Sequence, residues 1–209
     1  MPLDLSTVIA PERTALVLMD LQTVLLGDQE RALYGSASVD RLLATTVRLA
    51  GAARDAGVPV VHCPKVERPD GRGAAVNAPM WWRSARTGEY RTPAGSPDAD
   101  IIAALGPEPA DLVVPRSRGA SIFTGTELDF VLRGLGVTAL VVAGISLNVG
   151  IVGACIEAIS RNYSVVVASD AVAAIPDSYT DVMLTGSIRP TAVVGTSDDV
   201  IACWLMHKE

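Results

Sequence analysis

The sequence predicts an α/β fold with three layers, in which helices cover both faces of a doubly wound, six-stranded parallel sheet. Short runs rich in β-branched residues recur along the chain. Each run is continuously apolar rather than alternating, as is typical of strands buried on both faces. The segments between the runs are long enough for crossover helices. With 209 residues, 49% of them hydrophobic, we expect a single domain over residues 1–209.

Strands and helices are expected to alternate along the chain. The strands are expected at residues 14–20, 59–65, 111–116, 139–145, 164–170 and 192–196. Helical periodicity is clearest over residues 39–56, 126–136, 148–162 and 177–188. Residues 66–97, rich in Gly, Pro and Arg, interrupt this order. They carry Trp81 and Trp82, and we expect a long loop or a short helical lid that covers a substrate or packs against a second subunit.

Composition and charge narrow the classes of partner. The net charge of -6 and the lack of a basic stripe disfavour nucleic acid and anionic membranes, which need a cationic face. The first apolar stretch breaks at Asp20, too early for a signal peptide or a membrane-spanning helix. The three cysteines are widely spaced, which argues against a disulfide framework. We therefore expect a cytoplasmic protein that binds a small molecule.

Residues at the strand ends are the first candidates for a site, because ligands of open parallel sheets bind outside the carboxyl ends of the strands. Asp20 ends the first expected strand, where partial burial would let its carboxyl group donate or accept a proton. Gln22 follows two residues later and could hold a substrate carbonyl or carboxylate. The alternative role of Asp20 is to cap the following helix.

Two further strand ends carry groups suited to anions. Arg116 and Arg118 follow the third expected strand and form a plausible clamp for a carboxylate, unless they are solvated surface charges. The fourth strand leads past Gly150 into a helix, whose first N–H groups suit an oxyanion or a carboxylate. The alternative is that Gly150 and Gly153 only let the helix pack closely on the sheet.

Together these segments resemble the isochorismatase-like hydrolases. The resemblance extends from about Thr14 to Trp204. It is carried by the strand with Asp20 and Gln22, by the run SIFTGTELDFVLRGLGVTALVVAGISLNVG, and by SVVVASDAVAA, which contains Asp170. Most members of that family use an Asp, a Lys and a Cys whose thiolate attacks a carbonyl group. The resemblance implies their α/β fold and a hydrolase activity.

The chain departs from that family pattern at two positions. The cysteine position falls on Gly150, and the lysine position falls on Arg116, or on Ser117 if the alignment shifts by one residue. An Arg keeps the positive charge but does not exchange a proton. The true isochorismatases, which cleave a vinyl ether, also lack the cysteine. Their chemistry implies a general acid, matched here by Asp20, that protonates carbon before water captures the oxocarbenium ion.

The leading hypothesis is therefore a hydrolase that needs no cysteine, with Asp20 as acid or base and Arg116 and Gly150 beside it. The expected substrate-binding residues are Gln22, Arg118, Trp81, Trp82, Ile145, Ser146 and Asn148. The backbone over residues 145–150 is expected to stabilise negative charge. The family resemblance also implies a non-proline cis peptide near Ile145 and Ser146, and a homo-oligomer such as a dimer or tetramer.

Two other functions remain open at this point. The chain could be an inactive family member that binds a ligand or acts as a scaffold, or an amidase with a displaced nucleophile such as Cys63. The zinc site of nicotinamidase-type relatives uses an Asp and two His, which the distant His62 and His207 cannot supply unless carboxylates replace them. We expect His62 to be a hydrogen-bonded residue at a strand end, and we expect no metal and no cofactor.

Overall fold

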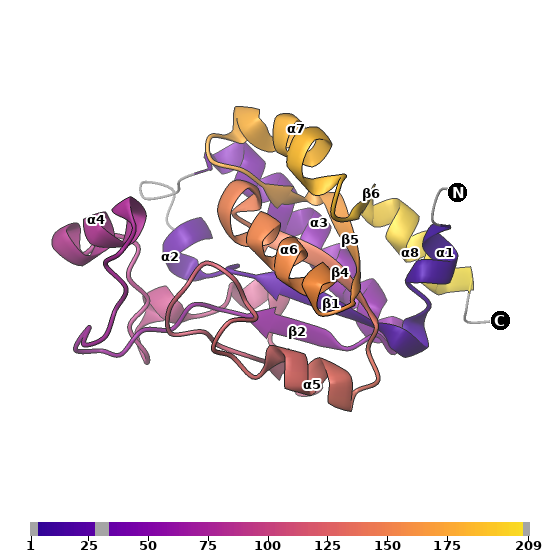
Figure 1. Ribbon diagram of the computed structural model, residues 1–209, viewed down its shortest axis with the longest axis horizontal. Coiled ribbons are helices and arrows are strands. Elements are labelled where there is room, and N and C mark those ends of the chain that lie inside the picture. Colours follow the sequence, from indigo (N-terminus) through magenta and orange to yellow (C-terminus); the bar gives the residue numbers. More distant parts are fainter. Residues whose placement is uncertain (1–3, 28–33, 207–209) are drawn as a thin grey trace.

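A six-stranded parallel sheet forms the centre of the computed structural model, which describes residues 4–27 and 34–206 (Figure 1). Its strands are β1 (Thr14–Met19), β2 (Val60–Cys63), β3 (Leu112–Val113), β4 (Ala139–Ile145), β5 (Ser164–Ala173) and β6 (Val193–Gly195). They lie in the order β3-β2-β1-β4-β5-β6, and all neighbours pair in parallel. The chain changes winding direction between β1 and β4, so the carboxyl ends of these two strands are where a crevice is expected.

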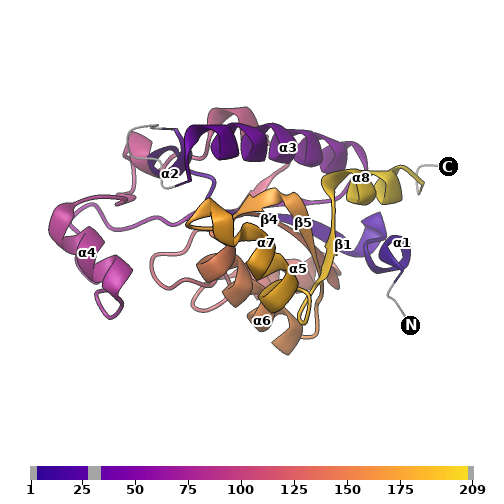
Figure 2. The same ribbon diagram turned by 90° about the horizontal axis from the view of Figure 1, so that it is seen from above.

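Helices cover both faces of this sheet. The helices among the described residues are α1 (Leu5–Val8), α2 (Thr23–Leu26), α3 (Ser36–Asp55), α4 (Pro79–Thr87), α5 (Leu128–Gly134), α6 (Val152–Ser160), α7 (Thr180–Met183) and α8 (Ser197–Met206). A π-helical turn, Leu147–Ile151, leads into α6, and a second, Leu184–Ile188, follows α7. Short 3-10 turns lie at Pro11–Arg13, Pro97–Ala99, Ala103–Leu105 and Asp177–Tyr179. Figures 1 and 2 show α4 standing apart from the other helices.

The alternation of side chains along β1 divides the core into two parts. Leu16 and Leu18 pack on one face with the buried residues of α3 and α8, whereas Ala15, Val17 and Met19 pack on the other with those of α5 and α6. Figure 2 shows α3 and α8 on one side of the sheet and α5 and α6 on the other. Because β1 is buried on both faces, all six of its residues are apolar or, as with Thr14, hydrogen-bonded.

The expected three-layer fold is confirmed, with three differences in its elements. The third strand shortens to β3 at the edge of the sheet, although isolated pairing continues between Lys65 and Arg116. The fifth strand is longer than expected. The C-terminal helix α8 was not predicted from periodicity. Its first residue, Ser197, donates to the Asp170 carboxylate from its N–H (2.7 Å) and from its hydroxyl (2.6 Å). Asp170 thus fixes the first residue of this helix, whereas the cap itself is Thr196: its hydroxyl accepts from the Asp199 N–H at 3.1 Å, and the Asp199 carboxylate accepts from the Thr196 N–H at 2.8 Å.

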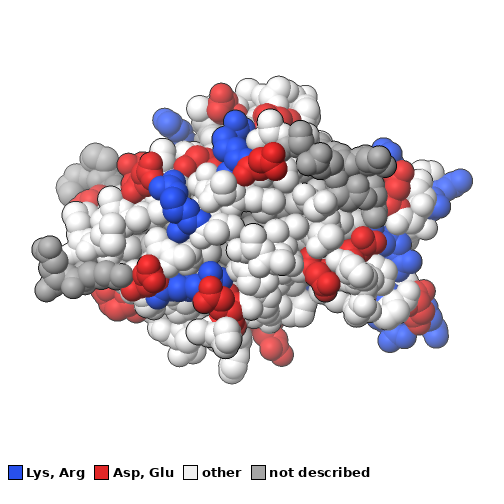
Figure 3. Space-filling model, turned by 180° about the vertical axis from the view of Figure 1, so that it is seen from behind, with Lys and Arg blue, Asp and Glu red and all other residues white. Residues whose placement is uncertain are grey.

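Charged side chains of both signs are mixed on the face of the molecule drawn in Figure 3, where the basic residues lie next to acidic ones. Within residues 4–27 and 34–206, no helix is both long and apolar enough to cross a bilayer.

Candidate active site

Asp20 leaves the end of β1 in a left-handed backbone conformation. Its φ is 56°, a value that Asp and Asn tolerate better than most residues, and the Gln22 N–H donates to the Asp20 carbonyl at 2.9 Å. The Asp20 carboxylate accepts two hydrogen bonds of 2.6 Å from the Arg116 guanidinium. The carboxylate is therefore half of a bidentate ion pair and does not cap α2.

Arg116 is buried, at 5% exposure, so a solvated surface charge is the wrong interpretation of this residue. Its Nε donates to the Gly119 carbonyl at 3.1 Å, and its Nη1 also reaches the Cys63 carbonyl at 3.3 Å. Burial lowers the pKa of Arg116, but the Asp20 carboxylate outweighs this effect and raises it above its ordinary value. The residue of this segment that pairs with Asp20 is therefore Arg116 and not its neighbour Ser117.

A cavity of about 420 Å³ opens beside this ion pair at the carboxyl ends of β1 and β4. The sequence-predicted residues that line it are Asp20, Gln22, Trp81, Arg116, Ile145, Ser146, Asn148 and Gly150. The other lining residues are Leu25, Tyr34, Lys65, Met80, Arg83, Ser84, Tyr90, Thr92, Gly119, Ala120, Val149 and Ile175. The volume suits a small molecule, and the side of α4 that carries Trp81 closes it like a lid.

Gln22 and Asn148 reach the cavity, but their amide groups are bonded to backbone. The Gln22 amide donates to the carbonyls of Lys65 (2.9 Å) and Ala99 (2.8 Å) and accepts from the Lys65 N–H (2.8 Å). The Asn148 amide donates to the Ile175 carbonyl at 2.8 Å and accepts from the Ile175 N–H at 3.1 Å. Both side chains hold other segments of the chain in place while they line the cavity, and their contact with substrate stays a prediction.

Gly150, at the expected cysteine position, lies next to the side chain of Met19. A Cβ atom added at Gly150 would stand 2.4 Å from Met19 Cε and 3.2 Å from its sulfur. Met19 is fully buried. The methionine thus occupies the volume that a side chain at position 150 would need. The peptide bond between Ile145 and Ser146 is cis, as the family resemblance implied.

Two predicted residues lie outside the large cavity. Trp82 is 53% exposed and packs under the Arg86 guanidinium, with 4.7 Å from Cζ to the ring centre. Trp81, one residue earlier on α4, is the tryptophan that lines the cavity. Arg118 lines a smaller neighbouring cavity instead. The expectation that Trp82 covers the site is therefore wrong for this cavity.

Tyr34 and Lys65 also line the large cavity, although neither was among the candidate site residues. The buried Tyr34 shares a hydrogen bond with the Ser146 side chain, and burial raises the pKa of Tyr34 far above its ordinary value. Lys65 pairs with Glu67, which also accepts from Arg91 Nε at 3.0 Å. Burial alone would raise the pKa of Glu67, but the hydrogen bonds from the two cations hold it below the usual range. Tyr34 carried no signal in the sequence, whereas Lys65 stands at an expected strand end.

The cysteines are poorly placed to act as nucleophiles. Cys63 is buried on the β2 strand and Cys155 in α6, and burial raises the pKa of each thiol to about 12. None of the three cysteines lines the cavity. His62 is buried and lies 3.1 Å from the Asp111 carboxylate. The part of the chain that the structure describes contains no cluster of three His, Cys, Asp or Glu side chains suited to a metal; His207 lies outside it.

Comparisons with known proteins agree with this architecture. The model of the isochorismatase domain matches residues 14–199. The ureidoacrylate amidohydrolase RutB of Methylobacterium radiotolerans is 32% identical over 178 residues, which cover 77% of this chain and 67% of that protein. This chain thus spans about two thirds of the length of that curated relative.

Solved structures extend the likeness over nearly the whole chain. A cysteine hydrolase from Pseudomonas syringae pv. phaseolicola 1448A superposes with a TM-score of 0.84 at 25% identity, covering 96% of both chains. An isochorismatase family protein from Burkholderia thailandensis has a TM-score of 0.76 at 31% identity and covers 93% of this chain and 96% of its own. The chain therefore belongs to the isochorismatase family, and it is a hydrolase.

Proposed function

We propose that this hydrolase acts on a small substrate that bears a carboxylate or carbonyl group, with Asp20 as the proton-transferring group and without a cysteine nucleophile. The observation that carries the proposal is the Asp20–Arg116 ion pair, which lies at the wall of the large cavity beside Gly150. Met19 fills the space where a thiol side chain would stand. Asp20 thus stands at the position of the family's acid, whereas the position of the family's cysteine is a glycine with no space for a side chain beside Met19.

Hydrolysis of a vinyl ether is the reaction that best fits these groups. The Asp20 carboxyl group would give a proton to the terminal carbon of the C=C bond, while the ether oxygen supplies electrons to form an oxocarbenium ion. Water then adds to this cation and returns a proton to Asp20, and the hemiketal separates into a carbonyl compound and an alcohol. A substrate carboxylate would bind at Arg116, next to the Asp20 carboxyl group.

Hydrolysis of a C–N bond is the second candidate, and the likeness to the ureidoacrylate amidohydrolase favours it. In this case Asp20 would accept a proton from the attacking water rather than donate one to carbon. An amidase with a displaced cysteine is disfavoured, because Cys63 and Cys155 are buried away from the cavity with raised pKa values. The two candidates differ in where the solvent proton ends up.

A substrate panel in D2O separates these candidates. Vinyl ethers, including isochorismate, and small amides and ureido compounds are incubated with wild type, Asp20→Asn and Asp40→Asn, and products are followed by mass spectrometry. Asp40 is an exposed aspartate on α3 and serves as the matched control. A vinyl ether protonated by the enzyme yields a product with one deuterium bound to carbon. We expect kcat to fall by about 100-fold or more in Asp20→Asn alone.

The outcomes are distinct. Carbon-bound deuterium whose formation needs Asp20 supports acid catalysis. Amide turnover that needs Asp20, without carbon-bound deuterium, supports the second candidate. Turnover that survives in folded Asp20→Asn removes Asp20 from the chemistry and refutes the proposal. Ligand binding without turnover of any compound in the panel would also contradict it and favour a binding protein.

A further inference from the structure

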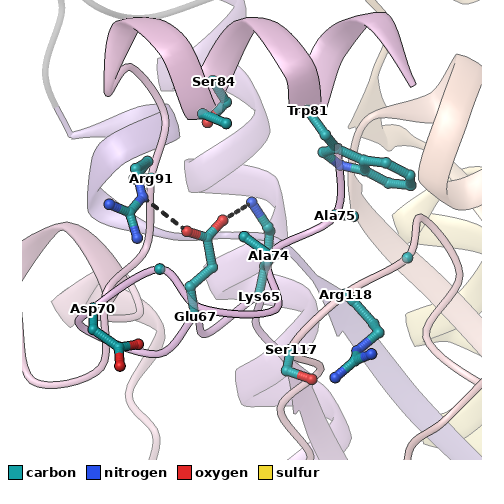
Figure 4. A pocket seen from close by; sticks show the side chains of 13 residues that line it. Lys65, Glu67, Asp70, Ala74, Ala75, Trp81, Ser84, Arg91, Ser117 and Arg118 are labelled. Carbon is teal, nitrogen blue, oxygen red and sulfur yellow. Dashed lines mark hydrogen bonds and ion pairs between the residues drawn. The ribbon is translucent and has the colours of Figure 1, made fainter. Parts of the chain in front are cut away.

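A second, smaller cavity of about 220 Å³ adjoins the large one. Lys65, Trp81, Ser84 and Gly119 line both. The loop after β3 forms part of the wall between them: Arg116 lines the large cavity, whereas Ser117 and Arg118 line the small one. Figure 4 shows the side chains of Ser117 and Arg118 together in the small cavity, with Glu67 between Lys65 and Arg91.

The charges of this small cavity do not balance. Lys65 and Arg91 both pair with Glu67, and Asp70 pairs with Arg68 at 2.8 Å. Among the described residues that line it, Arg118 is the cation without a carboxylate partner. The cavity therefore has a free guanidinium group.

Arg91 supplies a second donor to the small cavity. Its Nη2 is buried and has no hydrogen-bond partner within the described residues. A Cβ atom at Gly71, which also lines the cavity, would stand 2.9 Å from this nitrogen. The absence of a side chain at Gly71 thus leaves room beside an unpaired donor. Buried donors of this kind normally have a partner, and a ligand oxygen would supply one.

We infer that the small cavity is a subsite for a second anionic group, such as a carboxylate, and that the substrate of this enzyme is bipartite. The inference rests on the proposed function. One end of the substrate lies at Asp20 and Arg116, and the other is bound by Arg118, by the Ser117 hydroxyl and by the free nitrogen of Arg91. Guanidinium groups bind carboxylates with two parallel hydrogen bonds, which suits this end of the site. Lys65 and Trp81 lie at the junction that the middle of the substrate would cross.

Binding of linear dicarboxylates tests this inference without any need for turnover. Calorimetric titration compares malonate, succinate, glutarate and adipate with monocarboxylates of the same chain length. We expect the dicarboxylate of matching length to bind wild type at least tenfold more tightly than its monocarboxylate partner, because a second charge-assisted bond forms. In Arg118→Ala this preference should be lost, and in Arg118→Lys it should be partly retained.

Arg72→Ala is the matched control, since Arg72 is an exposed arginine next to Gly71 of the small cavity but does not itself line either cavity. Thermal unfolding of each variant shows that it is folded. The inference is overturned if no dicarboxylate exceeds its monocarboxylate partner, or if the preference is the same in Arg118→Ala as in wild type. Loss of the preference in Arg72→Ala as well would show that it depends on the overall positive charge of this region, and this result would also overturn the inference. Failure of the turnover panel alone, with the preference intact, would instead count against the proposed function.

Discussion

Met19 and Gly150 offer a direct test of why this chain has no side chain at the cysteine position. The added Cβ atom of Gly150→Ala would lie 2.4 Å from Met19 Cε, whereas carbon atoms in contact prefer about 3.5–4.0 Å. One of the two groups must therefore move by more than about 1 Å. Met19 Cε is the end of a flexible side chain, but Met19 is fully buried, so its displacement must be taken up by the core residues packed around it.

The expected magnitude follows from two opposing effects. Overpacking of this size costs about 1–3 kcal/mol, and replacement of Gly by Ala in a helix returns up to about 1 kcal/mol. We expect Gly150→Ala to lower the free energy of unfolding by about 1–2 kcal/mol. Gly153→Ala is the matched control, because a Cβ atom there meets nothing within 4 Å. It should be neutral or slightly stabilising.

Urea unfolding of Gly150→Ala, Met19→Ala and the double variant measures the coupling between the two positions. Met19→Ala alone should cost about 2–5 kcal/mol through its cavity. In the double variant the clash is gone, so the sum of the single losses should exceed the double loss by about 1–3 kcal/mol. Additivity within about 0.5 kcal/mol would refute the reasoning, as would an equal loss in Gly153→Ala.

Three further predictions follow from the same site. Arg116→Met should lower the free energy of unfolding by about 3–5 kcal/mol in urea melts, because it leaves Asp20 buried and unpaired; a loss below about 1 kcal/mol would show that water replaces the pair. Trp81→Ala should raise KM for an identified substrate, because Trp81 lines the large cavity, while Trp82→Ala should leave KM unchanged. Equal effects of the two variants in steady-state kinetics would contradict the role of Trp81 as a lid over the cavity. The pKa of Glu67 is held low, so its contribution to stability is present above the unfolded pKa of about 4.3 and is lost as pH falls through the lower folded value. Glu67→Gln should therefore show a smaller loss of stability between pH 5 and about 3 in urea melts, and an unchanged acid profile would contradict the sign.

The fold was predictable because its buried strands have a recognisable pattern of apolar residues. Buried parallel strands such as β4 must be apolar on both faces, and this pattern is visible in the sequence. The C-terminal helix α8 was not predicted from periodicity, since Leu205 and Met206 are apolar but exposed and obscure the pattern of its buried residues. Its capping box, formed by Thr196 and Asp199, is a local signal that could have found it.

Part of the site was predictable for a related reason. Strand-end positions brought Asp20 and Arg116 into consideration, and the parallel sheet places such ends together. The sequence could not show that the side-chain amides of Gln22 and Asn148 form hydrogen bonds with backbone groups far away in the chain. It also could not show which of the adjacent tryptophans faces inward, because α4 contacts little else that would mark one side of it as buried.

The Asp20–Arg116 pair also constrains how this enzyme can evolve. Its two members lie 96 positions apart in the chain, yet each neutralises the other inside the protein. A mutation at either position alone leaves a buried charge unpaired, so such a variant loses stability unless a second mutation compensates for it. Across homologous genes, positions 20 and 116 should therefore change together, and a lineage that alters one is expected to carry a matching change in the other.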